Sequence, residues 1–365
     1  MRKIRVGVVF GGRSAEHEVS LQSAKNVLEA LDPQKYEPIL LGIDREGRWH
    51  LDEETRLLFQ AARPLANLTA DSPREVGLVA RGEQSRLLDL SSDREIEHLD
   101  VLFPVLHGPY GEDGSVQGLA RLSDLPCVGA GILGSAVGMD KDVMKRLLRE
   151  AGVPVARCLV LHRARPVPSF SRVVEELGTP VFVKPANLGS SVGIGKPGDQ
   201  ESFTRAVAEA FRFDTKLLVE ERIEGREIEC SVLGNDDPRA SVPGEIVTGG
   251  GHDFYDYQAK YIDENGAELL IPAPLDPPTT ERIRALALRA FRVLCCEGMA
   301  RVDMFLRASG EVLVNEINTI PGFTRISMYP KLWEATGMSY RDLVDALITL
   351  AIERHERERG LSTTP

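Results

Sequence analysis

One stretch near the C-terminus restricts the fold more than any other part of the chain. Residues 300–319, ARVDMFLRASGEVLVNEINT, have the pattern of two strands joined at Ser309-Gly310. A two-residue turn determines which residues of an antiparallel hairpin lie opposite each other. Counting outward from this turn gives the predicted pairs Ala308 with Glu311, Leu306 with Leu313, Asp303 with Glu316, and Arg301 with Asn318.

The hairpin is predicted to have one polar and one apolar face, because successive residues of a strand point to opposite sides. Two carboxylates directly opposite each other repel unless a cation lies between them. Carboxylate and carboxamide oxygens are ligands of Mg²⁺ and Mn²⁺, so a metal site is one interpretation of the polar face. A solvated strand face in which Arg301 pairs with one carboxylate is the other. The polar face would carry Arg301, Asp303, Glu316 and Asn318, and the apolar face Met304, Leu306, Leu313 and Ile317.

A Gly/Ser loop upstream favours the metal interpretation, because Mg²⁺ commonly completes its coordination with phosphate oxygens. The loop, KPANLGSSVGIGK, follows Lys184 at a predicted strand end and includes Ser190 and Ser191. Its backbone N–H groups can point at phosphate oxygens. It is not a Walker A loop, since Ser190 stands at the first glycine position and Pro197 follows the last lysine. A plain linker is the alternative.

A second glycine motif, GAGILG at residues 129–134, matches the dinucleotide-binding spacing G-x-G-x-x-G. Only residues 126–128 precede it as a short strand. The first strand of the chain, where such a fingerprint normally follows, ends at Gly11-Gly12 without a third glycine at the required interval. A nicotinamide-dependent dehydrogenase is therefore a weak alternative.

The N-terminal part is predicted to be α/β with a mostly parallel sheet. A β-branched run ends in a glycine turn and precedes a helical pattern at residues 19–31. Residues 36–43 and 100–108 are predicted strands, and the polar stretch 52–97 between them has little periodicity.

A helix beginning at Asp140 marks the expected start of a second domain. Asp140 is a suitable N-cap, and Gly152 with Pro154 ends the helix. Its predicted apolar face carries Val143, Met144, Leu147 and Leu148. Further on, the patterns predict helices at 202–211 and 280–296, strands at 216–221 and 227–234, and a long loop at 248–263.

Composition narrows the range of functions. A chain of 365 residues with 42% hydrophobic and 27% charged residues is typical of a globular protein with two or three domains. The net charge of −11, without a Lys/Arg run, argues against a nucleic-acid or anionic membrane partner.

No apolar run approaches the ~20 residues of a membrane helix and no signal peptide is evident, so we expect a cytoplasmic protein. The five cysteines lack C-x-x-C spacing, which is typical of reduced thiols.

Eight ordered motifs together resemble the D-alanine:D-alanine ligases of the ATP-grasp group, and most closely their longer forms. This resemblance implies an α/β and α+β ATP-grasp fold with an N-terminal parallel-sheet domain at residues 1–139, a central subdomain at 140–222 and a C-terminal subdomain at 223–365. The motifs are VFGGRSAEHEVSLQSAKN, HGPYGEDGSVQG, MDKDVMKRLL, FVKPANLGSSVGI, GREIECSVLGN, FYDYQAKYID, MARVDMF and NEINTIPGFT.

The resemblance also implies an activity and its partners. The chain would use ATP and two Mg²⁺ or Mn²⁺ ions to join two D-alanines for peptidoglycan precursors, and would form a homodimer. Activation by a monovalent cation is left open, and so is a non-catalytic ATP-binding regulator with the same fold. The implied metal ligands are Asp303, Glu316 and Asn318.

Nucleotide-binding residues follow from the same resemblance. Lys141 and Lys184 would contact the α- and β-phosphates, and Lys260 the γ-phosphate. Glu220 would accept from the adenine amino group, and Glu227 would bind the ribose. From the residues alone, Lys141 also fits an exposed first helical turn. Glu221 departs from the family pattern beside the expected adenine site. Ser190, Ser191, Ile223 and Asn315 complete the implied ATP site.

The implied amino-acid site draws on distant segments. Glu16 would bind the ammonium of the first D-alanine and hydrogen-bond with Ser190 and Tyr261, although it could also cap the following helix. Tyr261 favours an amine acceptor over D-lactate. His107 would lie near the first substrate, with a purely structural role as the alternative. Arg301 and the Gly322 N–H would stabilise a tetrahedral oxyanion, and Ser327 would bind the second carboxylate.

Overall fold

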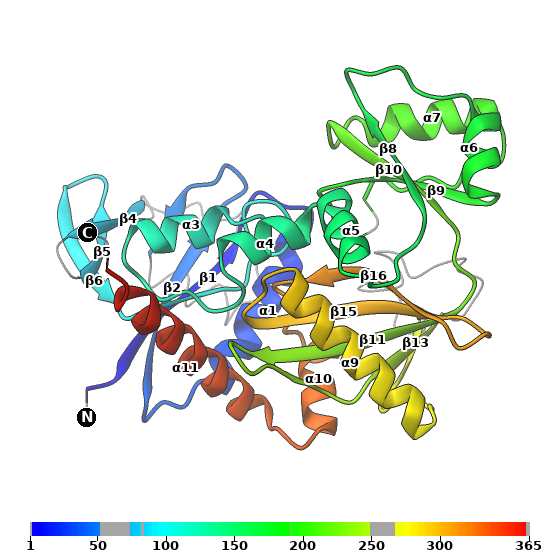
Figure 1. Ribbon diagram of the computed structural model, residues 1–365. Coiled ribbons are helices and arrows are strands. Elements are labelled where there is room, and N and C mark those ends of the chain that lie inside the picture. Colours follow the sequence, from blue (N-terminus) through cyan, green and yellow to red (C-terminus); the bar gives the residue numbers. More distant parts are fainter. Residues whose placement is uncertain (1, 52–73, 82–83, 191, 249–266, 363–365) are drawn as a thin grey trace.

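A computed structural model of the protein describes residues 2–51, 74–81, 84–190, 192–248 and 267–362. The described chain forms four β-sheets with helices packed around them (Figure 1). No helix among these residues is long and apolar enough to cross a membrane.

The N-terminal part contains β1 (Ile4–Gly11), α1 (His17–Ala30), β2 (Tyr36–Ile43), β3 (Trp49–His50) and β7 (Val101–Pro104). The strand order is β3-β2-β1-β7, with β1 parallel to β2 and β7, which confirms the predicted parallel sheet. Strand β1 is buried on both faces, as parallel strands usually are. Gly11 ends it at φ +89°, where a Cβ would lie 2.3 Å from the Ile43 carbonyl oxygen, so the turn requires glycine.

Within the polar stretch 52–97, the expectation of little regular structure is wrong for the described residues. Three antiparallel strands form a small sheet there: β4 (Val76–Arg81), β5 (Gln84–Asp89) and β6 (Arg94–Leu99). Val76, Leu78 and Leu87 are buried in a core that they share with the N-terminal sheet. Charged residues stand between these apolar positions, so the alternation that is typical of a strand is not apparent in the sequence.

Four helices that we did not predict pack against the cores of the N-terminal and C-terminal sheets. The C-terminal helix α11 packs against the same core as β1 and α1, so the two ends of the chain share one apolar interior. The glycines at 129–134 pack tightly: a Cβ on Gly134 would lie 2.7 Å from the Cys295 carbonyl oxygen. Only an isolated bridge between Cys127 and Leu102 precedes the motif, instead of a strand, so the motif lacks the setting of a dinucleotide fingerprint and the dehydrogenase interpretation is not supported. The helices are α3 (Ser115–Leu122), α4 (Ile132–Met139), α10 (Met328–Ala335) and α11 (Tyr340–Arg359).

The central part forms a separate lobe at the upper right of Figure 1. Its three-stranded antiparallel sheet has the order β8-β10-β9, and α6 and α7 pack against it around their own core. Helix α5 (Lys141–Glu150) leads into this lobe, and the Asp140 side chain accepts from the N–H groups of Asp142 and Val143, which confirms the predicted N-cap. The lobe contains β8 (Cys158–His162), α6 (Phe170–Leu177), β9 (Val181–Pro185), α7 (Gln200–Ala210) and β10 (Lys216–Glu221).

The C-terminal sheet has the order β14-β13-β11-β15-β16, with β12 beside β11 and helix α9 on one face. Each of the four sheets falls within one of the three expected segments, although the bounds of the domains stay a prediction. The elements are β11 (Arg226–Gly234), β12 (Arg239–Ala240), β13 (Gly244–Thr248), β14 (Ala267–Leu270), α9 (Pro277–Val293), β15 (Gly298–Leu306) and β16 (Val312–Asn318).

The register of the β15–β16 hairpin is right at one end and wrong at the other. Asp303 lies opposite Glu316 as predicted, but Leu306 lies opposite Val312. The Arg307 N–H donates to the Glu311 carbonyl oxygen, so three residues form the turn instead of two. A β-bulge between Asp303 and Met304 then restores the predicted register. Consequently the apolar face includes Val312 and Val314, and Leu313 is not part of that core.

Candidate active site

Three carboxylates lie in one row across neighbouring strands of the C-terminal sheet. Glu229 on β11 is opposite Asp303 on β15, which is opposite Glu316 on β16. We call these residues, with Arg301 and Asn318, the acidic wall. Glu229 was not predicted, because its strand is distant from the hairpin in sequence. The bulge allows the consecutive side chains of Asn315 and Glu316 both to face the cleft described below.

Cationic side chains separate the acids of this wall. Arg301 donates to both carboxylate oxygens of Asp303 at 2.7 Å, and its Nε lies 2.8 Å from Glu229 Oε2. Lys141 Nζ lies 3.2 Å from Glu316 Oε2. The structure thus contains the Arg301 pairing that was the alternative to a metal site.

The same residues nevertheless fit a divalent metal. Asp303 and Glu316 supply carboxylate oxygens from facing strands. Asn318 Nδ2 donates to Asp303 Oδ2 at 2.9 Å, which leaves its carbonyl oxygen for another partner. This all-oxygen donor set suits Mg²⁺ or Mn²⁺. Among the described residues no three His, Cys, Asp or Glu side chains converge as a ready metal site, so the acids would exchange Arg301 and Lys141 for the ion.

Opposite the acidic wall lies a cluster of lysines around one glutamate, which we call the lysine wall. Lys184 Nζ on β9 lies 2.6 Å from Glu220 Oε2, and Lys145 Nζ on α5 lies 3.2 Å from Glu220 Oε1. Lys141, one turn before Lys145, donates to the Leu188 carbonyl oxygen at 2.8 Å. All four side chains are buried or nearly so.

This arrangement corrects the predicted face of α5. Lys141, Met144, Lys145 and Leu148 are buried, whereas Leu147 is 39% exposed. The exposed first turn that we considered for Lys141 is therefore wrong. Buried lysines are tolerated here because carboxylates on other elements compensate for their lost hydration.

The charges of the lysine wall shift one another's pKa values. Burial opposes ionisation of Glu220, but Lys145 and Lys184 outweigh it and lower the pKa of this carboxyl. Burial also opposes the charge on Lys184, yet Glu220 and Glu316 raise its pKa. Burial lowers the pKa of Lys145, and Glu220 acts in the opposite direction. We take the cluster as ionised, because each partner stabilises the charge of the other.

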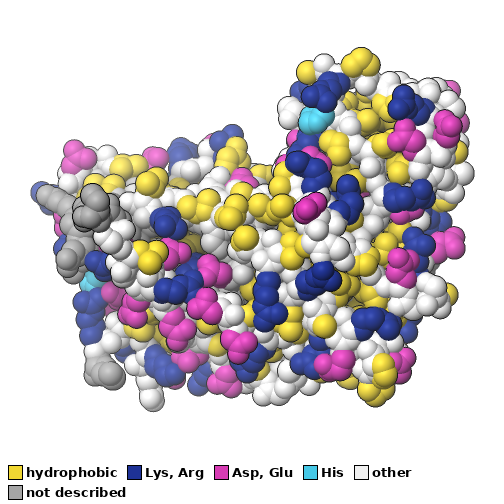
Figure 2. Space-filling model, in the orientation of Figure 1, with side chains coloured by type: hydrophobic (Ala, Val, Ile, Leu, Met, Phe, Trp, Pro, Cys, Tyr) yellow, Lys and Arg dark blue, Asp and Glu magenta, His cyan; other side chains and the backbone are white. Residues whose placement is uncertain are grey.

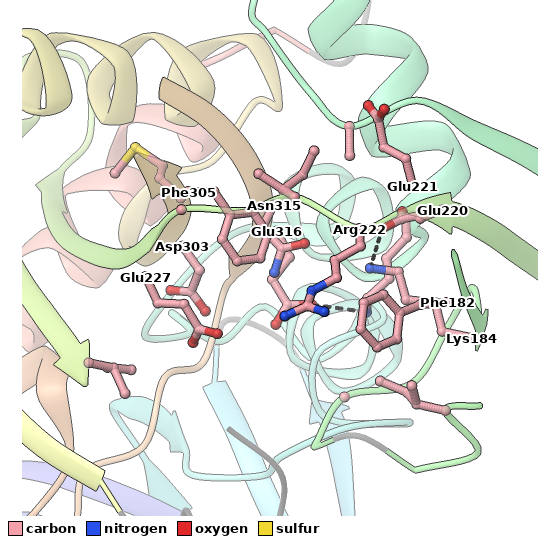
Figure 3. Close-up of a pocket in the computed structure, with 18 of the residues that line it drawn as sticks. Phe182, Lys184, Glu220, Glu221, Arg222, Glu227, Asp303, Phe305, Asn315 and Glu316 are labelled. Atoms are coloured by element: carbon pink, nitrogen blue, oxygen red, sulfur yellow. Dashed lines mark ion pairs between the residues drawn. The ribbon is translucent and has the colours of Figure 1, made fainter. Parts of the chain in front are cut away.

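The main cleft lies between these two walls and has a volume of about 440 Å³. Figure 3 shows Asp303, Glu227, Asn315 and Glu316 toward one side and Lys184 with Glu220 toward the other. The following residues that we expected in an ATP site line the cleft: Lys141, Lys184, Ser190, Glu220, Ile223, Glu227 and Asn315.

Glu220 and Glu221, at the end of the cleft where we expected adenine, have partners that the sequence did not predict. Both carboxylate oxygens of Glu220 contact lysines, so its proposed bond to adenine would compete with these contacts. The family departure at Glu221 has a local explanation: its carboxylate accepts from the Arg157 Nε at 2.9 Å and from the Arg157 backbone N–H at 2.8 Å. Figure 3 shows this carboxylate at the edge of the view, away from Glu227.

A smaller pocket, with a volume of about 80 Å³, adjoins the main cleft. Glu316, Gly189 and Ser190 line both spaces. The smaller pocket brings together all the described residues that we expected in an amino-acid site: Glu16, His107, Ser190, Arg301, Gly322 and Ser327. The metal-ligand candidates therefore lie where the two spaces meet.

Glu16 connects the N-terminal part to the Gly/Ser loop, since its carboxylate accepts a hydrogen bond from Ser190 Oγ. Its side chain does not cap α1, so the capping alternative is wrong. Ser190 has φ +47°, an uncommon conformation for serine, and this backbone geometry directs its hydroxyl across the interface.

Glu112 is a second buried carboxylate of the smaller pocket, and we did not predict it. It accepts from the N–H of Gly108 at 2.7 Å and from the N–H of Ile320 at 3.2 Å. Burial and the nearby Glu16 raise the pKa of Glu112 to about 8. His107 beside it bonds through Nδ1 to the Ile320 carbonyl oxygen at 3.1 Å, and burial lowers its pKa. Its sequence position in HGPYGEDG was the only available signal for Glu112.

The loop that carries Gly322 is attached to two helices. The Phe323 carbonyl oxygen accepts from Asn26 Nδ2 at 3.0 Å and from the Tyr340 hydroxyl at 2.7 Å. A Cβ on Gly322 would lie 2.7 Å from Ser327 Oγ, so a larger residue here would displace the Ser327 hydroxyl. Ser327 Oγ in turn accepts from the Thr324 N–H at 3.0 Å. The predicted Ser191, Lys260 and Tyr261 lie outside the described residues.

Comparison with known proteins agrees with this geometry. The family model described as D-ala D-ala ligase N-terminus matches residues 5–130, and the one described as D-ala D-ala ligase C-terminus matches residues 147–349. The chain is 52% identical to a D-alanine--D-alanine ligase of Shouchella clausii over 365 residues, covering 100% of this chain and 99% of the relative. It is 51% identical to D-alanine--D-alanine ligase A of Escherichia coli K12, with both chains covered in full.

Solved structures give the same result. The D-alanine-D-alanine ligase of Coxiella burnetii superimposes with a TM-score of 0.87 at 41% identity, covering 98% of this chain and 97% of that one. The VanG D-Ala:D-Ser ligase of Enterococcus faecalis has a TM-score of 0.83 at 35% identity, covering 96% and 100%. The similarity extends over both pockets and both walls, and the chain belongs to the D-alanine–D-alanine ligase family.

Proposed function

We propose that the protein joins two D-alanine molecules into D-alanyl-D-alanine for peptidoglycan precursors, with cleavage of ATP to ADP and phosphate. One observation carries this proposal beyond family membership: the main cleft and the smaller pocket meet at Glu316. A nucleotide in the first space and an amino acid in the second would have their reacting groups at that junction. Because the reaction consumes ATP, we place it in the cytoplasm.

Activation of the first substrate is the initial step. Glu16 binds the ammonium group, and a carboxylate oxygen of the same D-alanine attacks the γ-phosphorus, which yields an acyl phosphate and ADP. Phosphoryl transfer depends on positioning and charge neutralisation. Lys141 and Lys184 hold the α- and β-phosphates and Lys260 the γ-phosphate. When bound at Asp303, Glu316 and Asn318, two Mg²⁺ or Mn²⁺ ions would supply further positive charge beside the phosphates.

Ligation follows when the amine of the second D-alanine attacks the carbonyl carbon of the acyl phosphate. The new C–N bond forms, the amine loses a proton, and inorganic phosphate leaves. Arg301 and the Gly322 N–H stabilise the tetrahedral oxyanion. Glu229 orients Arg301 from the neighbouring strand through their 2.8 Å contact. Ser327 holds the carboxylate of the second substrate.

Product analysis tests the proposal directly. Protein, ATP, Mg²⁺ and D-alanine should together release phosphate and form the dipeptide, and omission of D-alanine should abolish phosphate release. Phosphate release that does not depend on D-alanine would contradict the proposal. Adding D-serine and D-lactate as competitors measures acceptor choice, which matters because one solved relative is a D-Ala:D-Ser ligase. We expect the amine acceptor D-alanine to be preferred.

We also infer that the protein forms a homodimer through α3 and α4. Hydrophobic side chains gather over these helices (Figure 2). Leu122 is 83% exposed, Leu133 is 60% exposed, and Ile132, next to Leu133 in the chain, is 40% exposed. Such a patch is typical of a surface that binds another protein. Light scattering should give twice the chain mass, and Leu133→Glu should give the monomer mass. A monomeric wild type would contradict this inference.

A further inference from the structure

Lys145 is a buried cation that the proposed reaction does not use. Its side chain is fully buried, one helical turn after Lys141, and Nζ lies 3.2 Å from Glu220 Oε1. Unlike Lys141 and Lys184, it does not line the main cleft. It therefore approaches Glu220 from behind, on the side away from the nucleotide space.

Glu220 lies between two lysines that have different access to the cleft. Lys184 faces the cleft and donates to Glu220 Oε2 at 2.6 Å. If Lys184 binds phosphate, as the proposed function requires, Glu220 and the phosphate compete for the same ammonium group. A buried carboxylate that loses its counter-ion is strongly destabilised. With Lys145 in place, Glu220 keeps one cationic partner when Lys184 turns to the nucleotide.

We propose that Lys145 is a positioning residue for nucleotide binding, because it holds Glu220 and thereby releases Lys184 to the phosphates. This inference rests on the proposed function of Lys184. Charge supports it: Lys145, Lys184 and Glu220 together carry a net charge of +1, so one cation is available to an anionic ligand. Removal of Lys145 would leave a neutral Lys184–Glu220 pair, and phosphate would have to break that pair.

A double-mutant cycle of Lys145→Met and Glu220→Gln tests the proposal, with ADP and ATP affinity measured by titration calorimetry. Methionine fills a similar volume without the charge. In the otherwise wild-type protein, Lys145→Met should weaken ADP binding by about 10- to 100-fold, as expected when a charged hydrogen bond becomes unavailable. In the Glu220→Gln background the same change should have an effect of less than about 3-fold, because no carboxylate then retains Lys184.

Two controls separate positioning from general effects. Arg146→Met removes a neighbouring exposed cation of α5 and should leave ADP affinity unchanged. A purely structural or long-range charge role for Lys145 would give equal losses in both backgrounds of the cycle, and this result would overturn the proposal. If Lys145→Met does not fold, the ADP affinities of Glu220→Gln and of the double variant still test the proposal. Equal affinities would support it, and unequal affinities would contradict it.

The proposed function and this inference fail in different ways. A wild-type protein that does not bind ATP would contradict the function itself. A wild type that binds ATP, together with a folded Lys145→Met variant that binds it equally well, would contradict only the role of Lys145.

Discussion

The two walls of the main cleft use opposite charges but the same principle. Asp303 and Glu316 of the acidic wall pair with Arg301 and with Lys141 of the lysine wall, and on the lysine wall Glu220 pairs with Lys145 and Lys184. In each case a side chain of the protein occupies the position of a ligand charge. The walls differ in burial: the side chains of Asp303 and Glu316 are 13% and 20% exposed, whereas those of Glu220 and Lys145 are 6% and 0% exposed.

This difference determines how easily each wall can change partners. Asp303 and Glu316 can regain more water than Glu220 when they lose a cation, so the exchange of Arg301 or Lys141 for a metal should cost less than the loss of a lysine at Glu220. A buried acid cannot be rehydrated in the same way. The lysine wall therefore needs a second permanent cation, and the acidic wall does not. Four substitutions test this contrast.

The largest effect is expected for Asp303→Asn on the acidic wall. Loss of one metal-binding carboxylate should lower kcat/KM by about 10³-fold, since metals contribute several kcal/mol to charge stabilisation. The thermal unfolding midpoint should change little, because the side chain contributes no core packing. Phosphate release and scanning calorimetry measure the two quantities. Asp236→Asn, at an exposed ion pair with Arg357, is the matched control. Full activity of Asp303→Asn would remove the metal assignment.

A smaller loss is expected for Lys184→Met on the lysine wall. The variant lacks one charged contact to phosphate, so the Kd for ATP should rise by about 10- to 100-fold. The KM for D-alanine should remain close to that of the wild type, because the smaller pocket does not include Lys184. A variant in which only the D-alanine KM changes would place Lys184 outside the nucleotide site.

Glu229→Gln tests a residue of the acidic wall that acts through Arg301. The substitution weakens the contact that orients Arg301, and we expect kcat to fall by about 10-fold. ATP affinity should change less than kcat, because Arg301 lines only the smaller pocket, whereas Glu229 lines both spaces. Equal losses in kcat and ATP affinity would point to general damage of the sheet instead.

The last prediction concerns stability rather than activity, at Glu112. Its pKa is raised to about 8 in the folded protein from an ordinary value of 4.5. Between these two values the folded state keeps a proton that the unfolded state has lost, so stability should fall as the pH rises from about 4.5 to about 8 and then level off. The midpoint of wild-type unfolding should therefore decrease relative to that of Glu112→Gln over this range. Parallel curves would show that Glu112 does not titrate there.

Hairpin pairing and strand alternation predicted the pair Asp303 and Glu316 correctly, although the predicted turn was wrong. The turn was counted one residue too short, and the bulge at Asn315 compensated for that error exactly where the carboxylates lie. Strand alternation and cross-strand pairing are short-range properties, so Asp303 and Glu316 could be matched from the hairpin alone. The third acid of the row, Glu229, could not, because no local pattern reports which strand will become a neighbour.

The lysine wall could not be predicted from helical periodicity, for a different reason. Helical periodicity assigned Leu147 to the buried face of α5, yet Lys141 and Lys145 occupy it. Hydrophobic patterns assume that charges face water, and this assumption fails when a partner from another element neutralises them. The smaller pocket, assembled from Glu16, Glu112 and Arg301, was accessible only through family motifs.

The bulge in the β15–β16 hairpin has a further consequence for how this chain tolerates change. It divides the hairpin into an inner segment that carries the acids and an outer segment that ends in the turn, and each has its own alignment of residues. If the tip is shortened or lengthened by one residue, the resulting change of register can therefore be absorbed near Asn315. The pairing of Asp303 with Glu316 should therefore tolerate a change of one residue at the tip.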